Sequence, residues 1–131
     1  MTTGLLDTSV WIAAELGRTI DAAKVPDAVR VSVVTLGELE AGVLAAADAA
    51  TTSTRLGTLE KAQSCEPLPI DAAVSREWAL LRVQLARAGR RANVNDLWIA
   101  ATARANRLPV VTQDDDFDVL AQLGLVEIVK V

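Results

Sequence analysis

The sequence predicts an α/β fold in which helices cover both faces of a mostly parallel sheet. Short apolar runs that suit strands alternate along the chain with longer segments whose apolar residues recur at helical spacing. The 131 residues are 51% hydrophobic, which is enough for the core of one domain spanning residues 1–131. Because only 3% are aromatic, we expect that core to consist of small and branched side chains.

The first part of the chain contains two predicted strand and helix units. Residues 4–6 form a short apolar strand, and residues 9–16 carry apolar residues at helical spacing, which leaves Asp7 at the joint. The β-branched run 29–34 predicts the second strand. The helix that follows this strand holds Glu38 in its first turn.

The middle of the chain is less regular. Residues 45–63 are rich in Ala and Thr, which predicts a helical pair interrupted near residues 51–53 and only lightly anchored to the core. Residues 66–70 form a short connection or edge strand that proline limits. Asp71 then caps a strongly amphipathic helix that ends at Gly89.

The last part of the chain predicts a buried helix followed by a strand, a short helix and a strand. The buried helix covers residues 97–106, which are almost all apolar or small, and begins at Asn93 or Asn95. The three later elements are expected at residues 108–112, 114–120 and 126–131.

Composition narrows the possible functions. The single cysteine, Cys65, cannot form an internal disulfide, and no run approaches the roughly 18 to 20 apolar residues that cross a bilayer. No secretion signal precedes the first strand, so we expect a cytoplasmic protein without a membrane segment. Because the chain has no histidine, any catalysis must depend on carboxylates rather than imidazole.

Charge is distributed unevenly along the chain. The net charge of -4 argues against a protein that wraps nucleic acid through bulk positive charge. Residues 76–107 nevertheless contain many arginines against only Glu77 and Asp96. A solvated helix face and loop explain this concentration as well as a nucleic-acid contact does.

Four acidic residues stand at joints between the predicted elements. Asp7 follows the first strand, and Asp114 follows the strand that ends at Thr112. Glu38 and Asp96 lie near the beginnings of two helices. In an open parallel sheet, the carboxyl ends of strands and the amino ends of the following helices line one crevice. We therefore expect the four carboxylates to converge there.

Helix capping explains each of these acids taken singly. Residues 35–38 match a capping box, residues 93–96 resemble one, and Asp7 or Asp114 can cap a helix with a side-chain oxygen. Caps, however, need not all gather at one end of a sheet. Clustered carboxylates repel one another, and a divalent cation removes that conflict. Because only hard oxygen ligands are available, the site suits Mg²⁺ or Mn²⁺ rather than zinc.

The motifs around these acids resemble those of PIN domains, and most closely the VapC-type toxins of bacterial toxin-antitoxin pairs. The likeness runs from near the first residue to the last strand, and the motifs come in the family's order. They are residues 7–9 after the opening strand, 35–38 with Leu39 and Gly42, 95–96 leading into 99–103, and 111–112 followed by Asp114 and by 116–117.

The resemblance implies a three-layer α/β/α sandwich, a homodimer and endonucleolytic cleavage of RNA that depends on Mg²⁺ or Mn²⁺. Ser9 and Thr112 match hydroxyl residues that support such sites, although a helix cap and a strand end explain them equally well. The catalytic, metal-binding acids that it implies are Asp7, Glu38, Asp96 and a fourth at Asp114, with Asp116 as second choice.

The resemblance also implies a cognate antitoxin that forms a hetero-oligomer with the chain and presents a basic side chain to the acids. Leu56 and Leu59 are candidate docking points for it, or ordinary core residues. The candidates to hold the RNA backbone are Arg82, Arg87, Arg90 and Arg91.

Other functions fit the motifs less well. A haloacid-dehalogenase-type phosphatase needs a second Asp where this chain has Ser9, and a phosphorylation receiver domain needs a lysine where it has Gln113. The remaining alternative is a catalytically silent PIN-like module that binds protein or RNA. Acids at all four positions favour an enzyme.

Overall fold

The strands of the computed structural model, which describes all of residues 1–131, form one four-stranded sheet in the order β2-β1-β3-β4. Every pair of neighbours is parallel, so the expectation of a mostly parallel sheet is confirmed. An isolated bridge between Ser32 and Leu68 adds to the β2 edge. The strands are β1 (Thr3–Leu6), β2 (Ala28–Arg30), β3 (Val110–Thr112) and β4 (Ile128–Lys130).

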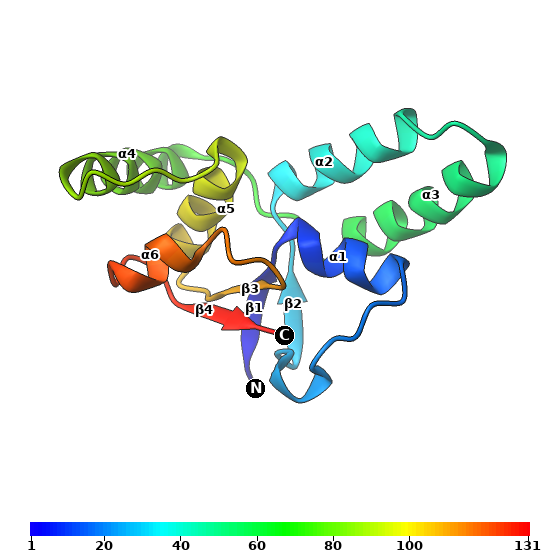
Figure 1. Ribbon diagram of the computed structural model, residues 1–131, viewed down its shortest axis with the longest axis horizontal. Helices are drawn as coiled ribbons and strands as arrows, with labels where there is room; N and C mark the ends of the chain where they lie inside the picture. The colour runs from blue at the N-terminus through cyan, green and yellow to red at the C-terminus, as the bar shows by residue number, and fades with distance from the viewer.

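Two pairs of helices pack together, α2 with α3 and α4 with α5, and the two pairs lie on opposite sides of the molecule (Figure 1). None of the helices is both long and apolar enough to cross a bilayer. Their bounds are α1 (Thr8–Glu15), α2 (Val33–Leu44), α3 (Ala49–Gln63), α4 (Ala72–Arg87), α5 (Val94–Ala105) and α6 (Asp118–Gln122), with a 3₁₀ turn at Ala22–Lys24.

Successive residues of the central strands point to opposite faces of the sheet, and each face packs on different helices. Leu5 of β1 and Val110 of β3 belong to the large core cluster that contains residues of α4, α5 and α6. Leu6 and Val111 instead pack with Val10 of α1. Helices therefore cover both faces, as an α/β/α sandwich requires.

The beginning of α2 differs from the expectation. The strand expected over residues 29–34 ends at Arg30, and the helix begins three residues later. Ser32 caps it, because its hydroxyl accepts a hydrogen bond of 3.1 Å from the backbone N–H of Thr35. This cap outweighs the β propensity of the two valines that follow. Glu38 consequently lies in the second turn of the helix, not the first.

The expected break near residues 51–53 is wrong. Asp48 caps α3 by accepting a 2.7 Å hydrogen bond from the backbone N–H of Thr51, so these residues lie near the start of one continuous helix. The helix is also firmly anchored at its other end, where Leu59 is only 3% exposed. Leu59 is therefore a core residue, while Leu56, at 42% exposed, stays on the surface.

The later helices begin at side-chain caps that the sequence indicates, with one exception. Asp71 and Asn93 cap α4 and α5 as expected. The helix expected over residues 114–120 begins only at Asp118. The backbone N–H of Asp114 instead donates a 3.0 Å hydrogen bond to the hydroxyl of Thr112, which holds Asp114 close to the end of β3.

Candidate active site

The centre of the site is Asp7, which directly follows β1, caps α1 and is only 3% exposed. Its Oδ2 accepts hydrogen bonds from the Ser9 hydroxyl at 2.7 Å and the Thr112 hydroxyl at 2.9 Å. Burial raises the pKa of Asp7, and the hydrogen bonds from Ser9 and Thr112 oppose that shift. The two hydroxyls thus hold a buried carboxylate in one orientation and favour its ionised form.

Ser9 and Thr112 also fix the loop that follows β3. Their hydroxyl oxygens lie 3.2 Å apart. The Ser9 hydroxyl accepts a hydrogen bond from the backbone N–H of Gln113 at 3.0 Å, and Thr112 accepts the one from Asp114. The helix-cap explanation of Ser9 does not hold, because Asp7 caps α1. Both hydroxyl side chains instead join Asp7 to the segment that carries Asp114.

Glu38 is tied to the same place through Thr8. The buried Thr8 hydroxyl donates a 2.8 Å hydrogen bond to Glu38 Oε1 and lies 3.0 Å from the Thr35 hydroxyl. This contact links the start of α1 to α2. Thr8 was not among the expected supporting residues, although its position directly after Asp7 offered an indication.

The five acids expected from the sequence meet around one depression of about 280 Å³ at the carboxyl ends of β1 and β3. Asp115 does not line it, because its carboxylate pairs with Lys130. Of the three consecutive acids, the structure therefore brings Asp114 and Asp116 to the site. The residues lining the depression are Asp7, Thr8, Ser9, Ile12, Arg18, Glu38, Asn93, Asp96, Asp114 and Asp116.

Electrostatic repulsion is strong in this depression. The pKa of Asp96 is raised to about 7, first by burial and then by the negative charges of neighbouring acids, chiefly Asp7 and Asp116. Burial and the same two neighbours raise the pKa of Asp114, and Arg18 partly opposes this. Arg18 is the one basic side chain that lines the site. The acids therefore carry more negative charge than the protein itself compensates.

The donors fit a hard divalent cation. All the ionisable donors are carboxylate oxygens, and hydroxyls support them, which suits Mg²⁺ or Mn²⁺ and not zinc. No group of three or more acidic side chains is arranged to hold one ion together. Mg²⁺ does not need such a group, because it commonly takes one or two carboxylates and keeps several waters.

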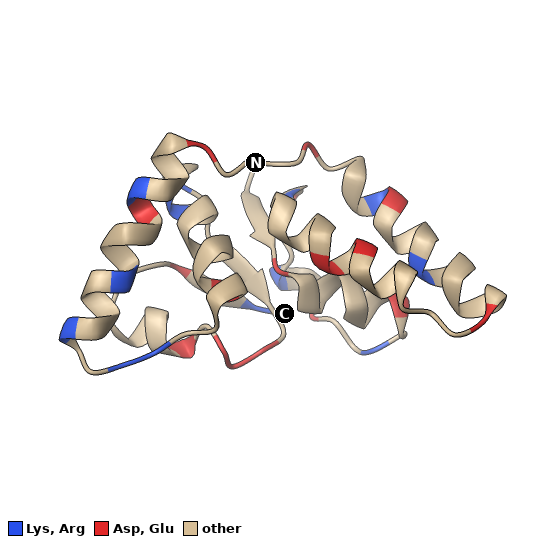
Figure 2. Cartoon of the chain, turned by 90° about the horizontal axis from the view of Figure 1, so that it is seen from above, with Lys and Arg blue, Asp and Glu red and all other residues tan.

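The basic residues divide into one that lines the acidic depression and others that lie away from it. Arg18 follows the left-handed Gly17 at the end of α1, and no periodicity or motif marked it for the site. Arg82, Arg90 and Arg91 line a separate cavity, and Arg87 lines neither of the two. Figure 2 shows basic residues recurring along α4 and in the loop after it, while acidic residues are spread over the molecule.

Fold and site together define a PIN domain. The chain belongs to the PIN-domain family, whose description matches residues 4–123. It is similar to two Mycobacterium tuberculosis proteins: Ribonuclease VapC5, 54% identical over 98% of this chain and 95% of that protein, and Ribonuclease VapC4, 44% identical over 95% of each. The family expected from the motifs is confirmed.

Solved structures agree with this assignment. The crystal structure of VapBC-5, a member of the VapBC family of toxin-antitoxin systems from Mycobacterium tuberculosis, matches with a TM-score of 0.91, 50% identity and full coverage of both chains. FitAcB from Neisseria gonorrhoeae matches with a TM-score of 0.73 and 26% identity, over 95% of this chain and 94% of that one. The expected PIN-like α/β/α fold is confirmed.

Proposed function

We propose that this protein is an endoribonuclease that hydrolyses RNA phosphodiester bonds with Mg²⁺ or Mn²⁺ and acts as the toxin of a type II toxin-antitoxin pair. The observation that carries the proposal is the depression lined by five carboxylates, with Asp7 held between the hydroxyls of Ser9 and Thr112. Membership of the PIN family and the similarity to named ribonucleases support RNA as the substrate.

The cation would take its one or two carboxylate ligands from Asp7, Glu38, Asp96 and Asp114, with Asp116 as a further candidate, and would keep several waters. When bound, such an ion polarises the scissile phosphate and lowers the pKa of a coordinated water. The chain's own groups orient the ligands: the Thr112 hydroxyl holds Asp7 and the Thr8 hydroxyl holds Glu38. Hydrogen bonds of this kind fix the direction of metal-binding oxygens and tune affinity.

Basic residues would position the RNA. Arg18, which lines the acidic depression, would contact a phosphate next to the cleaved bond. The exposed arginines of α4 and its following loop would contact the backbone farther along the strand, without reading sequence. These are Arg82, Arg87, Arg90 and Arg91.

A cognate antitoxin would cover the site in a hetero-oligomer. The VapBC structure that matches this chain belongs to a toxin-antitoxin system. An arginine of the antitoxin would neutralise the excess negative charge of the acids and bind a carboxylate bidentately. We also propose a homodimer, as the family resemblance implies, and action in the cytoplasm, where the unpaired Cys65 stays reduced.

Incubation of purified, antitoxin-free protein with total cellular RNA tests the proposal. Discrete fragments with Mg²⁺ or Mn²⁺ and none with EDTA are the expected result. Fragments that persist in EDTA argue against the metal site. A folded protein that retards RNA in a gel but never cleaves it would instead be the non-catalytic binding module.

A further inference from the structure

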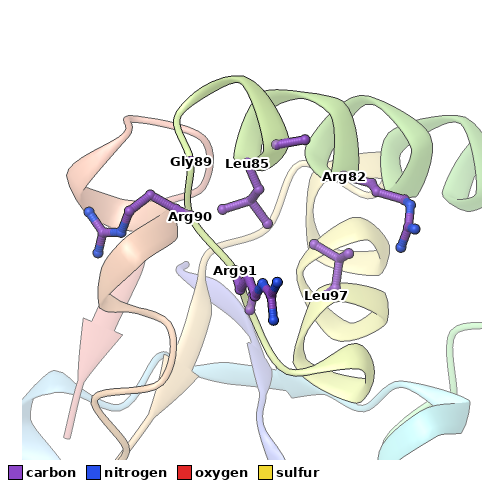
Figure 3. A pocket seen from close by; sticks show the side chains of 8 residues that line it. Arg82, Leu85, Gly89, Arg90, Arg91 and Leu97 are labelled. Carbon is purple, nitrogen blue, oxygen red and sulfur yellow. The ribbon is translucent and has the colours of Figure 1, made fainter.

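A second cavity, of about 570 Å³, lies between the carboxyl-terminal half of α4 and the first turn of α5 (Figure 3). Unlike the acidic depression, it has no acidic side chain in its lining. Its lining residues are Arg82, Leu85, Ala86, Gly89, Arg90, Arg91, Ala92 and Leu97.

The cavity has an apolar floor and a cationic rim. Leu85 of α4 and Leu97 of α5 project into the space between the two helices, with Arg82 and Arg90 on opposite sides of them (Figure 3). Both leucines are buried, at 4% and 6% exposed. Gly89 has φ of 65°, a left-handed conformation that turns the chain after α4 and brings Arg90 to the rim.

The cations on this rim have no acidic partners. Arg82, Arg90 and Arg91 form no ion pair, whereas Arg104 of the same basic segment pairs with Glu77. The Arg82 guanidinium lies 5.4 Å from the centre of the Trp78 ring, and Arg90 donates a hydrogen bond only to the side chain of Gln122. The rim therefore offers guanidinium groups free to bind phosphate or to stack.

The cavity adjoins the acidic depression through one turn of helix. Asn93 and Asp96 line the depression, while Ala92 and Leu97 line the cavity. The first turn of α5 thus has the acids on one side and the apolar floor on the other. Because a helical turn rises only about 5.4 Å, neighbouring nucleotides of one strand can occupy both places.

We propose that this cavity takes one unpaired nucleotide beside the cleaved bond, with its base on Leu85 and Leu97 and its flanking phosphates on Arg90 and Arg91. The proposal rests on the proposed function for RNA as the substrate, and it concerns a single-stranded segment of that RNA. Proteins recognise such RNA through unstacked bases that lie on apolar or guanidinium surfaces. The cavity volume falls within the range of about 300–1,000 Å³ usual for small-ligand sites.

Binding in EDTA tests the base site separately from catalysis. The probes are a fluorescent oligouridylate and a strand of abasic ribose phosphates of equal length. The wild-type protein should bind the oligouridylate about 5- to 150-fold more tightly, which is the gain in affinity from stacking one base. Ala86→Phe, which fills the cavity from an exposed position on α4, should remove most of this preference.

Charge variants measure the contribution of the arginines on the rim separately from that of the apolar floor. The double variant Arg90→Gln, Arg91→Gln should lower the salt dependence of binding by up to about 1.4 in the log-log slope, because each lost phosphate contact contributes about 0.7. Arg76→Gln is the matched control, since Arg76 is exposed on α4 and lines neither site. It should leave both the salt dependence of binding and the preference for bases unchanged.

Equal binding of the two strands by the wild type, or a preference that survives Ala86→Phe in a folded protein, overturns the proposal. As a second measurement, an oligonucleotide containing 4-thiouridine should photocrosslink within residues 82–97, and crosslinks confined to other segments contradict the base site. Both experiments measure binding and not cleavage, so they distinguish the two proposals. A protein that binds bases here but never cleaves RNA contradicts the proposed function and leaves this inference intact. A protein that cleaves RNA but binds the oligouridylate no better than the abasic strand contradicts this inference alone.

Discussion

The hydroxyl of Thr112 donates a 2.9 Å hydrogen bond to the carboxylate of Asp7, 105 residues away in the sequence. Thr112 is the last residue of β3, and Asp7 directly follows the neighbouring parallel strand β1; both residues are buried. This contact joins the first acid of the site to the loop that carries Asp114. The sheet therefore sets the distance between groups that come from opposite ends of the chain.

Replacement of Thr112 by Val keeps the shape of the side chain and removes the donor. We expect RNA cleavage and Mn²⁺ affinity to fall about 10- to 100-fold, the usual effect of losing a hydrogen bond to a metal ligand. Thr112→Ser, which retains the hydroxyl, should keep most of the activity. Equal activity of the Val and Ser variants would contradict the supporting role of Thr112.

The raised pKa of Asp96 makes the ion-free protein less stable at neutral pH than in mild acid. Because its folded pKa is about 7 and its ordinary value is 3.8, the folded state binds more protons than the unfolded state between these values. Stability in EDTA should therefore fall as pH rises from about 4 to 7. Thermal melts of the wild type and Asp96→Asn test this, and the variant should show a smaller fall. A wild-type protein equally stable at both ends of this range contradicts the prediction.

A divalent cation should reverse that loss. Binding to the folded state alone raises stability with ion concentration, and it should do so more above pH 7, where the acids are ionised. Differential scanning with Mn²⁺ should show a rise in Tm for the wild type and for Asp115→Asn, but none for Asp7→Asn. A rise of equal size in all three proteins would place the ion elsewhere.

Arg18 should matter for catalysis despite its exposure. Arg18→Gln removes the one cation of the acidic depression, so we expect cleavage to fall by about 10-fold and the pKa of Asp114 to rise. Lys24→Gln, which removes a cation outside the depression, is the control for net charge. If both variants lower activity equally, the effect of Arg18 is one of overall charge only.

The two leucines of α3 should differ in their contribution to stability. Leu59→Ala should lower the free energy of unfolding by about 2–5 kcal/mol, because the side chain is buried with Leu39 and Ala62. Leu56→Ala, on the exposed side of the same helix, should change it by no more than about 0.5 kcal/mol. Urea unfolding of both variants measures the difference, and similar losses would contradict the packing of α3.

The sequence predicts best the features that depend on local patterns. Apolar runs that alternate with helical segments indicate the parallel sheet, and Asp71 and Asn93 mark two helix starts. The acids at the ends of strands indicate that one crevice holds them. These features follow from backbone geometry and periodicity, so they need no knowledge of distant contacts.

Features that depend on tertiary contacts are predicted less well. The β-branched residues after Ser32 join a helix because its cap and packing outweigh propensity, and α3 is continuous because Asp48 caps the threonine-rich turn. Thr8 meets Glu38 and Arg18 meets the acids only after the helices pack. No local pattern specifies such meetings.

The most direct test of the proposed site compares RNA cleavage by Asp7→Asn and Asp115→Asn in the presence of Mn²⁺. Both variants replace one carboxylate by an amide, but Asp7 is buried among the acids and Asp115 faces Lys130 outside them. We expect Asp7→Asn to lose more than about 100-fold of the activity and Asp115→Asn to stay close to the wild type. Cleavage by folded Asp7→Asn at the wild-type rate would contradict the assignment of this acidic depression as the active site.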